Sequence, residues 1–129
     1  MLPKGKNIIL DKTFGFSLSI IKFCDELELQ KKYVIAKQLL RSGTSIGANV
    51  REAQSPQSRA DFIHKLKIAL KEVEETEYWL LLINASDSYP KNDQLVKDIL
   101  ELKLILSKIV STSKGNYLSE PEQEYLTSN

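Results

Sequence analysis

The chain has 129 residues, of which 42% are hydrophobic and 27% charged, and its formal net charge is +1 at pH 7. These values are typical of one globular domain and exclude a generally disordered chain. No apolar run reaches the ~18 residues of a membrane span, and the first residues lack the apolar core of a secretory signal, so we expect a cytoplasmic protein.

Four prolines divide the chain, and because proline breaks helix interiors they mark the ends of segments. Between them the sequence predicts helices at about 13–29, 31–54, 59–85 and 93–112. We therefore expect an all-α protein with a four-helix bundle domain at 1–114. Gly115 and Asn116 predict the stop of the last helix, and the polar, acidic residues 115–129 predict a mobile tail.

The helix expected at 13–29 carries two apolar stripes side by side. Apolar residues spaced alternately by four and three positions form a continuous stripe on a helix. The first stripe is Phe16, Ile20, Phe23 and Leu27, and the second is Phe14, Leu18, Ile21 and Cys24. Cys24 is the only cysteine, which excludes an intramolecular disulfide and favours a small apolar core residue.

The helix expected at 31–54 contains the run SGTSIG, which resembles a loop because glycine costs about 1 kcal/mol against alanine in a helix. The apolar stripe continues through it, so Gly43 and Gly47 predict a helix-packing ridge that lets another backbone approach. Ser42, Thr44 and Ser45 are expected to bond back to carbonyls one turn earlier or to reach a neighbouring helix. A phosphate-binding loop is disfavoured, because the following Lys-Ser/Thr pair and a preceding strand are missing.

Pro56 and Ser58 predict a short turn and a helix N-cap, with Asp61 in a loose capping box. The two flanking helices must then form an antiparallel hairpin. The stripe of the next helix has one polar interruption: Phe62, Leu66, Ala69, Val73, Thr76, Leu80 and Ile83. Its lysines precede its glutamates, against the helix dipole, which predicts cross-helix pairing. The expected pairs join the glutamates to Lys37 and Arg41, and Asp61 and Lys65 to Arg51 and Glu52.

The helix expected at 93–112 repeats the stripe with Leu95, Ile99, Leu102, Leu106 and Ile109. It carries further apolar residues beside this stripe, as the first helix does. We expect self-association to bury this additional apolar surface. The alternative is that it forms the thick core of a monomer.

The segments RSGTSIGANVREA and SRADFIHKLKIALKEVEETEYWL closely resemble the bacterial 23S ribosomal RNA intervening-sequence protein family, over about Asn7 to Thr112. The resemblance implies an antiparallel up-and-down four-helix bundle that assembles as a ring-shaped homopentamer, and no established enzyme activity. Some members are encoded inside ribosomal RNA genes, and a related bundle is an RNA-binding accessory protein of diversity-generating retroelements. The acidic segment after Gly115 lies outside the resemblance.

A local excess of positive charge is the best sign of nucleic-acid binding in the residues themselves. From Lys31 to Lys71 there are nine Lys or Arg residues against Glu52 and Asp61, a balance of +7. Four of the cations lie near one hairpin end: Arg51, Arg59, Lys65 and Lys67. A positive rim attracts phosphates, whereas an internally paired helix surface is the plainer interpretation. Aromatic residues do not interleave with these charges, so binding would be backbone-directed and salt-sensitive.

Enzyme interpretations are weaker. Asp61 and His64 share a helical face, but a di-iron site needs a second such pair and the chain has one histidine. The glutamates at 72, 74, 75 and 77 lack a neighbouring His or Cys, and Tyr78 and Trp79 are more typical of core or interface packing than of a ligand site.

The sequence thus predicts a non-enzymatic, homo-oligomeric helical-bundle scaffold whose partners are further copies of the chain and RNA or a ribonucleoprotein. The alternative is a scaffold that binds only protein, and a metal-dependent enzyme is the third hypothesis. No catalytic residue, metal, cofactor, membrane or small-molecule substrate is predicted.

Overall fold

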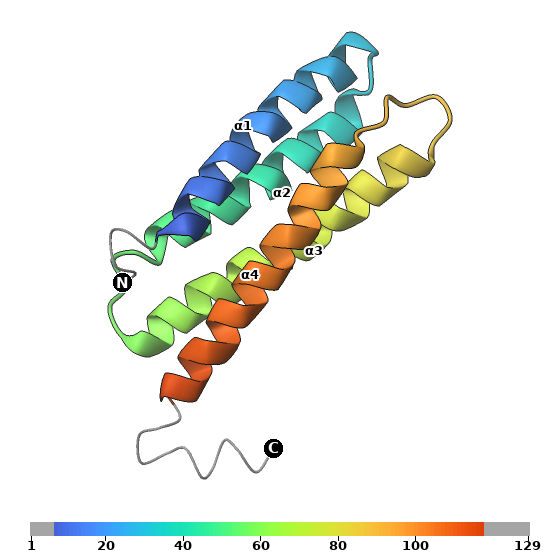
Figure 1. Ribbon diagram of the computed structural model, residues 1–129. Coiled ribbons are helices and arrows are strands. Elements are labelled where there is room, and N and C mark those ends of the chain that lie inside the picture. The colour runs from blue at the N-terminus through green and yellow to red at the C-terminus, as the bar shows by residue number, and fades with distance from the viewer. Residues whose placement is uncertain (1–6, 118–129) are drawn as a thin grey trace.

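The computed structural model describes residues 7–117, which form four α-helices (Figure 1). Their bounds are α1 Ile8–Leu29, α2 Tyr33–Glu52, α3 Arg59–Ala85 and α4 Asp93–Tyr117. Each helix packs against the next one in the chain, and α1 and α4 meet along a less extensive seam. Consecutive helices run in opposite directions in Figure 1, so the fold is the predicted all-α up-and-down bundle. No helix in this range is long and apolar enough to cross a membrane.

The predicted start of α1 at residue 13 is wrong, because the helix begins earlier in the chain. The helix begins at Ile8 because its first turn contributes to the core: Ile9 is buried, and the buried hydroxyl of Thr13 donates to the carbonyl oxygen of Ile9 at 2.8 Å. The sequence pattern does not reveal these first residues, because Thr13 is polar and interrupts the apolar stripe. Its hydroxyl can nevertheless be buried, since it is hydrogen-bonded within the helix.

The predicted start of α2 at residue 31 is also wrong, because Lys31 belongs to the end of α1. Its φ of 63° is left-handed. The N–H of Lys31 bonds to the carbonyl of Glu28 at 2.9 Å, and the N–H of Lys32 bonds to that of Leu27 at 2.9 Å. These bonds form a Schellman motif, in which glycine is the usual left-handed residue. The chain therefore reverses here without the glycine or proline signal that sequence reasoning relies on.

The end of α4 differs from the prediction in the opposite sense. The helix continues to Tyr117, so Gly115 and Asn116 lie within it and do not stop it. A glycine stop requires a left-handed residue, and no glycine in residues 7–117 has a positive φ. The predicted mobile tail begins at 115, but residues 115–117 are helical, and its remainder, 118–129, lies outside the described residues.

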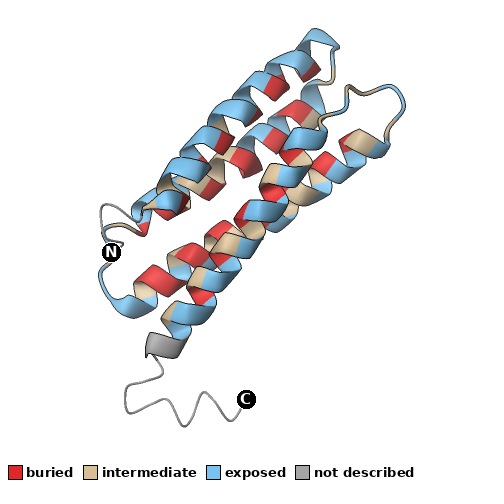
Figure 2. Cartoon of the chain, viewed as in Figure 1, coloured by how far each residue is buried: buried red, intermediate tan, exposed pale blue. Residues whose placement is uncertain are grey.

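The core follows the predicted stripes closely, as the buried residues along the inward sides of the helices in Figure 2 illustrate. Every residue of the α3 stripe and of the first α1 stripe is buried. The α4 stripe is buried from Leu95 to Leu106 but ends on Val110, with Ile109 half-buried. Of the second α1 stripe only Cys24 is buried, whereas Phe14, Leu18 and Ile21 are exposed.

Gly43 and Gly47 of α2 lie directly against α1. A Cβ at Gly43 would stand 2.9 Å from Cγ1 of Ile20, and one at Gly47 would stand 3.2 Å from the carbonyl oxygen of Thr13. Ile20 is fully buried, so it has no free space into which to withdraw. The small-residue run is therefore the surface on which α1 and α2 approach each other most closely.

The hydroxyl-bearing residues of the same run make both kinds of bond predicted for them. Thr44 and Ser45 donate to the carbonyl oxygens of Leu40 and Arg41, at 2.7 and 2.6 Å. Ser42 instead accepts from the hydroxyl of Thr76 on α3 at 2.9 Å, with both residues fully buried. Thr76 is the polar interruption in the α3 stripe, and this bond explains how the core accommodates it.

Cross-helix ion pairs join α2 and α3 as the charge order predicted. Arg41 contacts Glu75, and its Nη1 lies 3.4 Å from Oε1 of Glu72. At the other end of the hairpin, Nζ of Lys65 lies 2.8 Å from Oε1 of Glu52. Lys37 and Arg51, the other two cations expected to pair, are in none of the ion pairs found within residues 7–117. These pairs are exposed or partly exposed, so they contribute more to the choice of register than to stability.

The glycine contact predicts opposite effects for the same substitution at two positions. Gly15→Ala should raise the free energy of unfolding by about 1 kcal/mol, because alanine favours helix and an added Cβ there meets no atom within 4 Å. Gly43→Ala should lower it by up to about 2 kcal/mol, because overpacking against Ile20 outweighs that gain. Urea unfolding of both variants measures the difference, and equal shifts would contradict the close α1–α2 approach.

The buried hydroxyl pair predicts a non-additive double-mutant cycle. Thr76→Val should cost about 1 kcal/mol of unfolding free energy, because the buried hydroxyl of Ser42 loses its donor. Adding Ser42→Ala should recover part of that loss, since the hydroxyl left without its donor is then removed. Urea unfolding of the two single variants and the double variant gives the coupling energy. Strict additivity would mean that the hydroxyls do not interact.

Candidate nucleic-acid interface

The predicted basic cluster is built on the turn between α2 and α3. The hydroxyl of Ser58 accepts from the N–H of Asp61 at 3.0 Å, which is the predicted N-cap. The carboxylate of Asp61 in turn accepts from the N–H of Gln57 at 3.1 Å, one residue earlier than in a standard capping box. These bonds fix the start of α3, and with it the position of Arg59 in the first turn.

We call the four predicted cations, Arg51, Arg59, Lys65 and Lys67, the basic hairpin end. Arg51 is exposed in the last turn of α2, and Arg59 is exposed as the first residue of α3. Arg51 and Lys65 line one shallow depression between the two helices. Lys67 is exposed two residues beyond Lys65, which places it on the opposite side of α3 at about 100° of rotation per residue. The structure thus brings two of the four cations together.

Carboxylates reduce the positive charge of the depression. Its lining residues are Ala48, Arg51, Glu52, Ser55, Gln57, Asp61 and Lys65. The hydrogen bond to Glu52 raises the pKa of Lys65, with smaller contributions from the charges of Glu52 and Asp61. A phosphate in the depression would therefore meet two cations and two carboxylates, and Lys65 would have to leave Glu52 to bind it.

Lys114 is a cation that the sequence analysis did not assign to this end of the bundle. Nζ of Lys103 on α4 lies 3.0 Å from Oε1 of Glu77 on α3, and this pair sets the register of the two antiparallel helices. Eleven residues further along α4, Lys114 is thus opposite the part of α3 around Leu66, close to the level of Lys67. It is exposed. The position of Lys114 beside Lys67 depends on the register between α3 and α4, which the sequence alone does not determine.

Three aromatic residues with exposed or half-buried rings, Tyr78, Trp79 and Tyr89, lie away from the basic hairpin end. Trp79, in the second half of α3, is half-buried against the core, and its Nε1 donates to Glu75 at 3.0 Å. Its ring centroid is 5.4 Å from that of Tyr78. Tyr89, in the loop between α3 and α4, has the Nζ of Lys32 4.6 Å from its ring centroid. Phe62, in the first turn of α3, is only 5% exposed, so on α2 and α3 no exposed aromatic ring lies beside the basic hairpin end to stack with a base.

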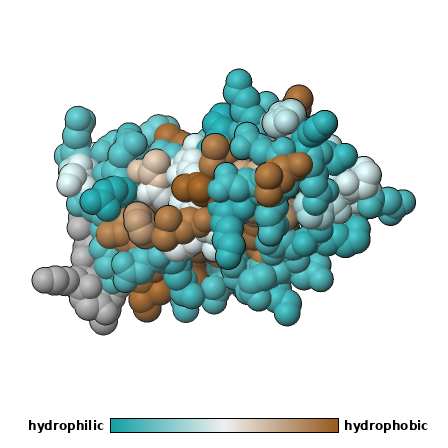
Figure 3. All heavy atoms as spheres, turned by 90° about the horizontal axis from the view of Figure 1, so that it is seen from above, coloured by the Kyte–Doolittle hydropathy of each residue, from teal (hydrophilic) through white to brown (hydrophobic). Residues whose placement is uncertain are grey.

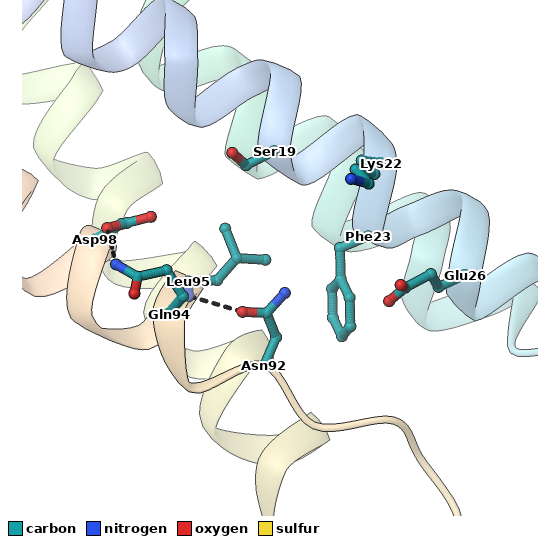
Figure 4. A pocket seen from close by; sticks show the side chains of 8 residues that line it. All are labelled: Ser19, Lys22, Phe23, Glu26, Asn92, Gln94, Leu95 and Asp98. Carbon is teal, nitrogen blue, oxygen red and sulfur yellow. Dashed lines mark hydrogen bonds between the residues drawn. The ribbon is translucent and has the colours of Figure 1, made fainter.

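The seam between α1 and α4 contains a second depression, shown in Figure 4. Phe23 and Leu95 contribute apolar surface, and the other lining residues are Ser19, Lys22, Glu26, Asn92, Gln94 and Asp98. Several of the polar groups are already engaged. Asn92 accepts from the N–H of Leu95 at 2.9 Å, as a cap of α4, and Gln94 donates to Asp98 at 2.9 Å. A neighbouring depression along the same seam is crossed by the Lys12–Glu101 ion pair, whose N–O distance is 3.1 Å.

The residues considered for metal or nucleophilic chemistry are scattered. His64 is exposed on the first half of α3, and no group of three or more His, Cys, Asp or Glu side chains within residues 7–117 is placed to hold a metal ion. Burial raises the pKa of the Cys24 thiol to about 12, with smaller contributions from Glu28 and Asp25. The thiol donates to the carbonyl of Ala36 at 3.4 Å, so Cys24 is a packed and unreactive side chain.

Comparisons with known proteins support the architecture. Residues 5–108 match a family model described as 23S rRNA-intervening sequence protein. A crystal structure of a protein of unknown function from the S23 ribosomal protein family of Bacteroides thetaiotaomicron is 46% identical, with a TM-score of 0.75. That match covers 79% of this chain and 97% of the other. Comparison with curated proteins gives no match.

Proposed function

The chain belongs to the 23S rRNA-intervening sequence protein family, and we propose that it is a non-enzymatic, homo-oligomeric scaffold that binds RNA through the basic hairpin end. The observation that carries the proposal is the set of cations at one end of the bundle, with Lys114 close to the level of Lys67. A single copy offers few unpaired charges, so the proposal requires that assembly repeat them.

Two exposed apolar faces support assembly. The first, the α1/α2 face, consists of Phe14, Leu18 and Ile21 on α1 and Leu40 on α2. The three α1 residues follow the spacing of one helical stripe, and Phe14 is 63% exposed. Leu40 lies three residues before Gly43, on the side of α2 that contacts α1. These side chains therefore flank the outer seam of the first hairpin.

The second, the α3/α4 face, consists of Tyr78 and Leu81 on α3 and Leu100 on α4. It surrounds the Glu77–Lys103 ion pair that bridges the two helices. Leu81 lies four residues after Glu77, and Leu100 three before Lys103, which places both beside the pair. In a bundle whose neighbours follow chain order, the first and second hairpins occupy opposite sides, so the two apolar faces point in opposite directions. Figure 3 illustrates how apolar side chains reach the surface among hydrophilic ones.

Two different faces on opposite sides favour head-to-tail association, in which the α1/α2 face of one copy meets the α3/α4 face of the next. Such contacts generate a ring when the rotation per copy closes. The homopentamer implied by the family resemblance is the ring that we propose. Every copy would then present its basic hairpin end on the same rim, and phosphates would meet a repeated band of positive charge. A scaffold that binds only protein is the second candidate, and the same exposed apolar residues favour it.

RNA binding is tested by charge reversal at the basic hairpin end. The chain carrying Arg51→Glu and Arg59→Glu should bind a structured RNA at least about tenfold more weakly than the native chain at ~50 mM salt, with a shallower dependence of affinity on salt. Fluorescence anisotropy at graded salt concentrations measures both quantities.

The matched control for that experiment is Lys22→Glu with Lys97→Glu. These exposed lysines lie in the other half of the bundle, and their reversal changes the net charge equally. The control should retain most of the affinity. Equal losses in the two variants, or no RNA binding by the native chain at ~50 mM salt, would refute the proposed site.

The assembly predicts a complementation experiment. Chains with Phe14→Glu and Ile21→Glu, or with Leu81→Glu and Leu100→Glu, should each sediment as monomers, because each has lost one face. An equimolar mixture should form heterodimers, since the intact face of one variant fits that of the other. The control Val34→Glu, at an exposed position off both faces, should sediment as a pentamer like the native chain. A native monomer at micromolar concentration would contradict the assembly.

A further inference from the structure

The end of the bundle opposite the basic hairpin end carries a second group of cations. Figure 1 shows the turn between α1 and α2 beside the loop between α3 and α4 at this end. Over residues 28–37 there are three lysines, Lys31, Lys32 and Lys37, against one glutamate, a balance of +2, and the loop residues 86–92 add no net charge. None of the three lysines is in an ion pair within residues 7–117. The positive charge is modest, so a polyanion would need further contacts to bind here.

An exposed aromatic residue lies among these lysines and offers such a contact. Tyr33 is the first residue of α2, directly after Lys32, and it is 57% exposed. Lys37 follows it by four residues, so the two side chains are neighbours on one face of α2. The expectation that no aromatic residue lies among the cations is therefore wrong at this end of the bundle. Basic residues beside an exposed aromatic ring are typical of surfaces that bind single-stranded nucleic acid.

The turn that carries Tyr33 is held from two sides. The two backbone bonds of the Schellman motif fix the reversal at Lys31. Nζ of Lys32 lies 4.6 Å from the centroid of the Tyr89 ring, which joins this turn to the loop between α3 and α4. A fixed turn loses little backbone freedom when the ring of Tyr33 binds a flat partner.

We propose that Lys31, Tyr33 and Lys37, which we call the tyrosine tip, form a second RNA contact that binds unpaired nucleotides. A base stacks on the ring of Tyr33, and the ammonium groups of Lys31 and Lys37 bind the neighbouring phosphates. A base inside a duplex has no free face, so the tyrosine tip prefers single strands. This contact shares its partner class with the proposed function but uses none of the residues of the basic hairpin end.

The two RNA contacts differ in kind and lie at opposite ends of α2. This helix has 20 residues, which at ~1.5 Å per residue separates its ends by about 30 Å. The basic hairpin end offers charge alone, which suits the phosphates of a paired RNA, whereas the tyrosine tip adds a ring that reads an exposed base face. In the proposed ring the tips would repeat on the rim opposite the basic hairpin ends. An RNA with both a duplex and an unpaired segment would therefore meet both contacts.

Stacking is tested with a short fluorescent oligouridylate, which has no paired structure, at ~50 mM salt. Tyr33→Leu removes the ring and should weaken binding at least about fivefold, whereas Tyr33→Phe keeps the ring and should bind within about twofold of the native chain. Fluorescence anisotropy measures the affinities, and urea unfolding checks that both variants are folded. Equal affinities of the two variants overturn the proposal.

The phosphate contacts are tested by Lys31→Gly with Lys37→Gln. This chain should bind the oligouridylate at least about fivefold more weakly, with a shallower dependence on salt. It should nevertheless be no less stable in urea, because glycine favours the left-handed backbone at residue 31. The matched control, Lys22→Gln with Lys97→Gln, loses the same charge at exposed positions outside the tip and should bind within about twofold of the native chain. Equal losses in the two chains overturn the phosphate contacts.

A fully paired RNA separates this proposal from the proposed function. Tyr33→Leu should leave the affinity for the duplex unchanged, since a paired base cannot stack on the ring. Duplex binding without oligouridylate binding overturns the tyrosine tip alone. Oligouridylate binding that depends on Tyr33, with duplex binding unaffected by reversal of Arg51 and Arg59, supports the tip and refutes the basic hairpin end. No RNA binding of either kind overturns both, and favours a protein partner for the exposed Leu29 and Val34 near Tyr33.

Discussion

The close approach of α1 and α2 through Gly43 and Gly47 is the constraint on which the rest of the bundle depends. With Ile20 against one glycine and the backbone of Thr13 against the other, the two helices pack with little room for rotation or sliding. The cost is helix propensity, since two glycines in one helix oppose its formation by about 2 kcal/mol. Tertiary packing offsets that cost, so α2 is a helix because of its neighbours more than because of its own residues.

The same contact determines which surfaces remain for other uses. Because the first apolar stripe of α1 packs into the core, the second stripe faces solvent. Phe14, Leu18 and Ile21 are therefore exposed. On the other side of α2, Ser42 faces α3 and accepts from Thr76 in an otherwise apolar interior. A hydrogen-bonded pair at one level of a bundle disfavours shifted registers, in which either hydroxyl would be buried without a partner. Glycines and buried hydroxyls thus fix the geometry, and the ion pairs along α2 and α3 reinforce it.

Sequence reasoning succeeded where a periodic pattern and the tertiary packing agree. The α3 stripe, the Ser58 cap and the pairs Arg41–Glu72 and Lys65–Glu52 were all predictable, because each depends on spacing within one helix or across one short turn. It failed where a residue adopts an uncharacteristic role. Lys31 occupies a left-handed position that glycine usually fills, and Gly115 remains helical. Lys114 was overlooked for another reason: its neighbours depend on the register between α3 and α4, which no local signal sets.

The candidate site was predictable as a set of residues but not as an arrangement. The sequence places four cations near one turn. In the structure, however, Lys65 forms an ion pair with Glu52, and Lys67 lies on the opposite side of α3. In one copy, then, the positive field is divided between two sides of the hairpin and partly cancelled. Head-to-tail contact of the α1/α2 and α3/α4 faces would change this, because it would bring Lys67 and Lys114 of one copy toward the first hairpin, and hence toward Arg51, of the next. The proposed assembly and the proposed binding site are therefore linked, because the cations of the basic hairpin end would form a continuous surface only between neighbouring copies.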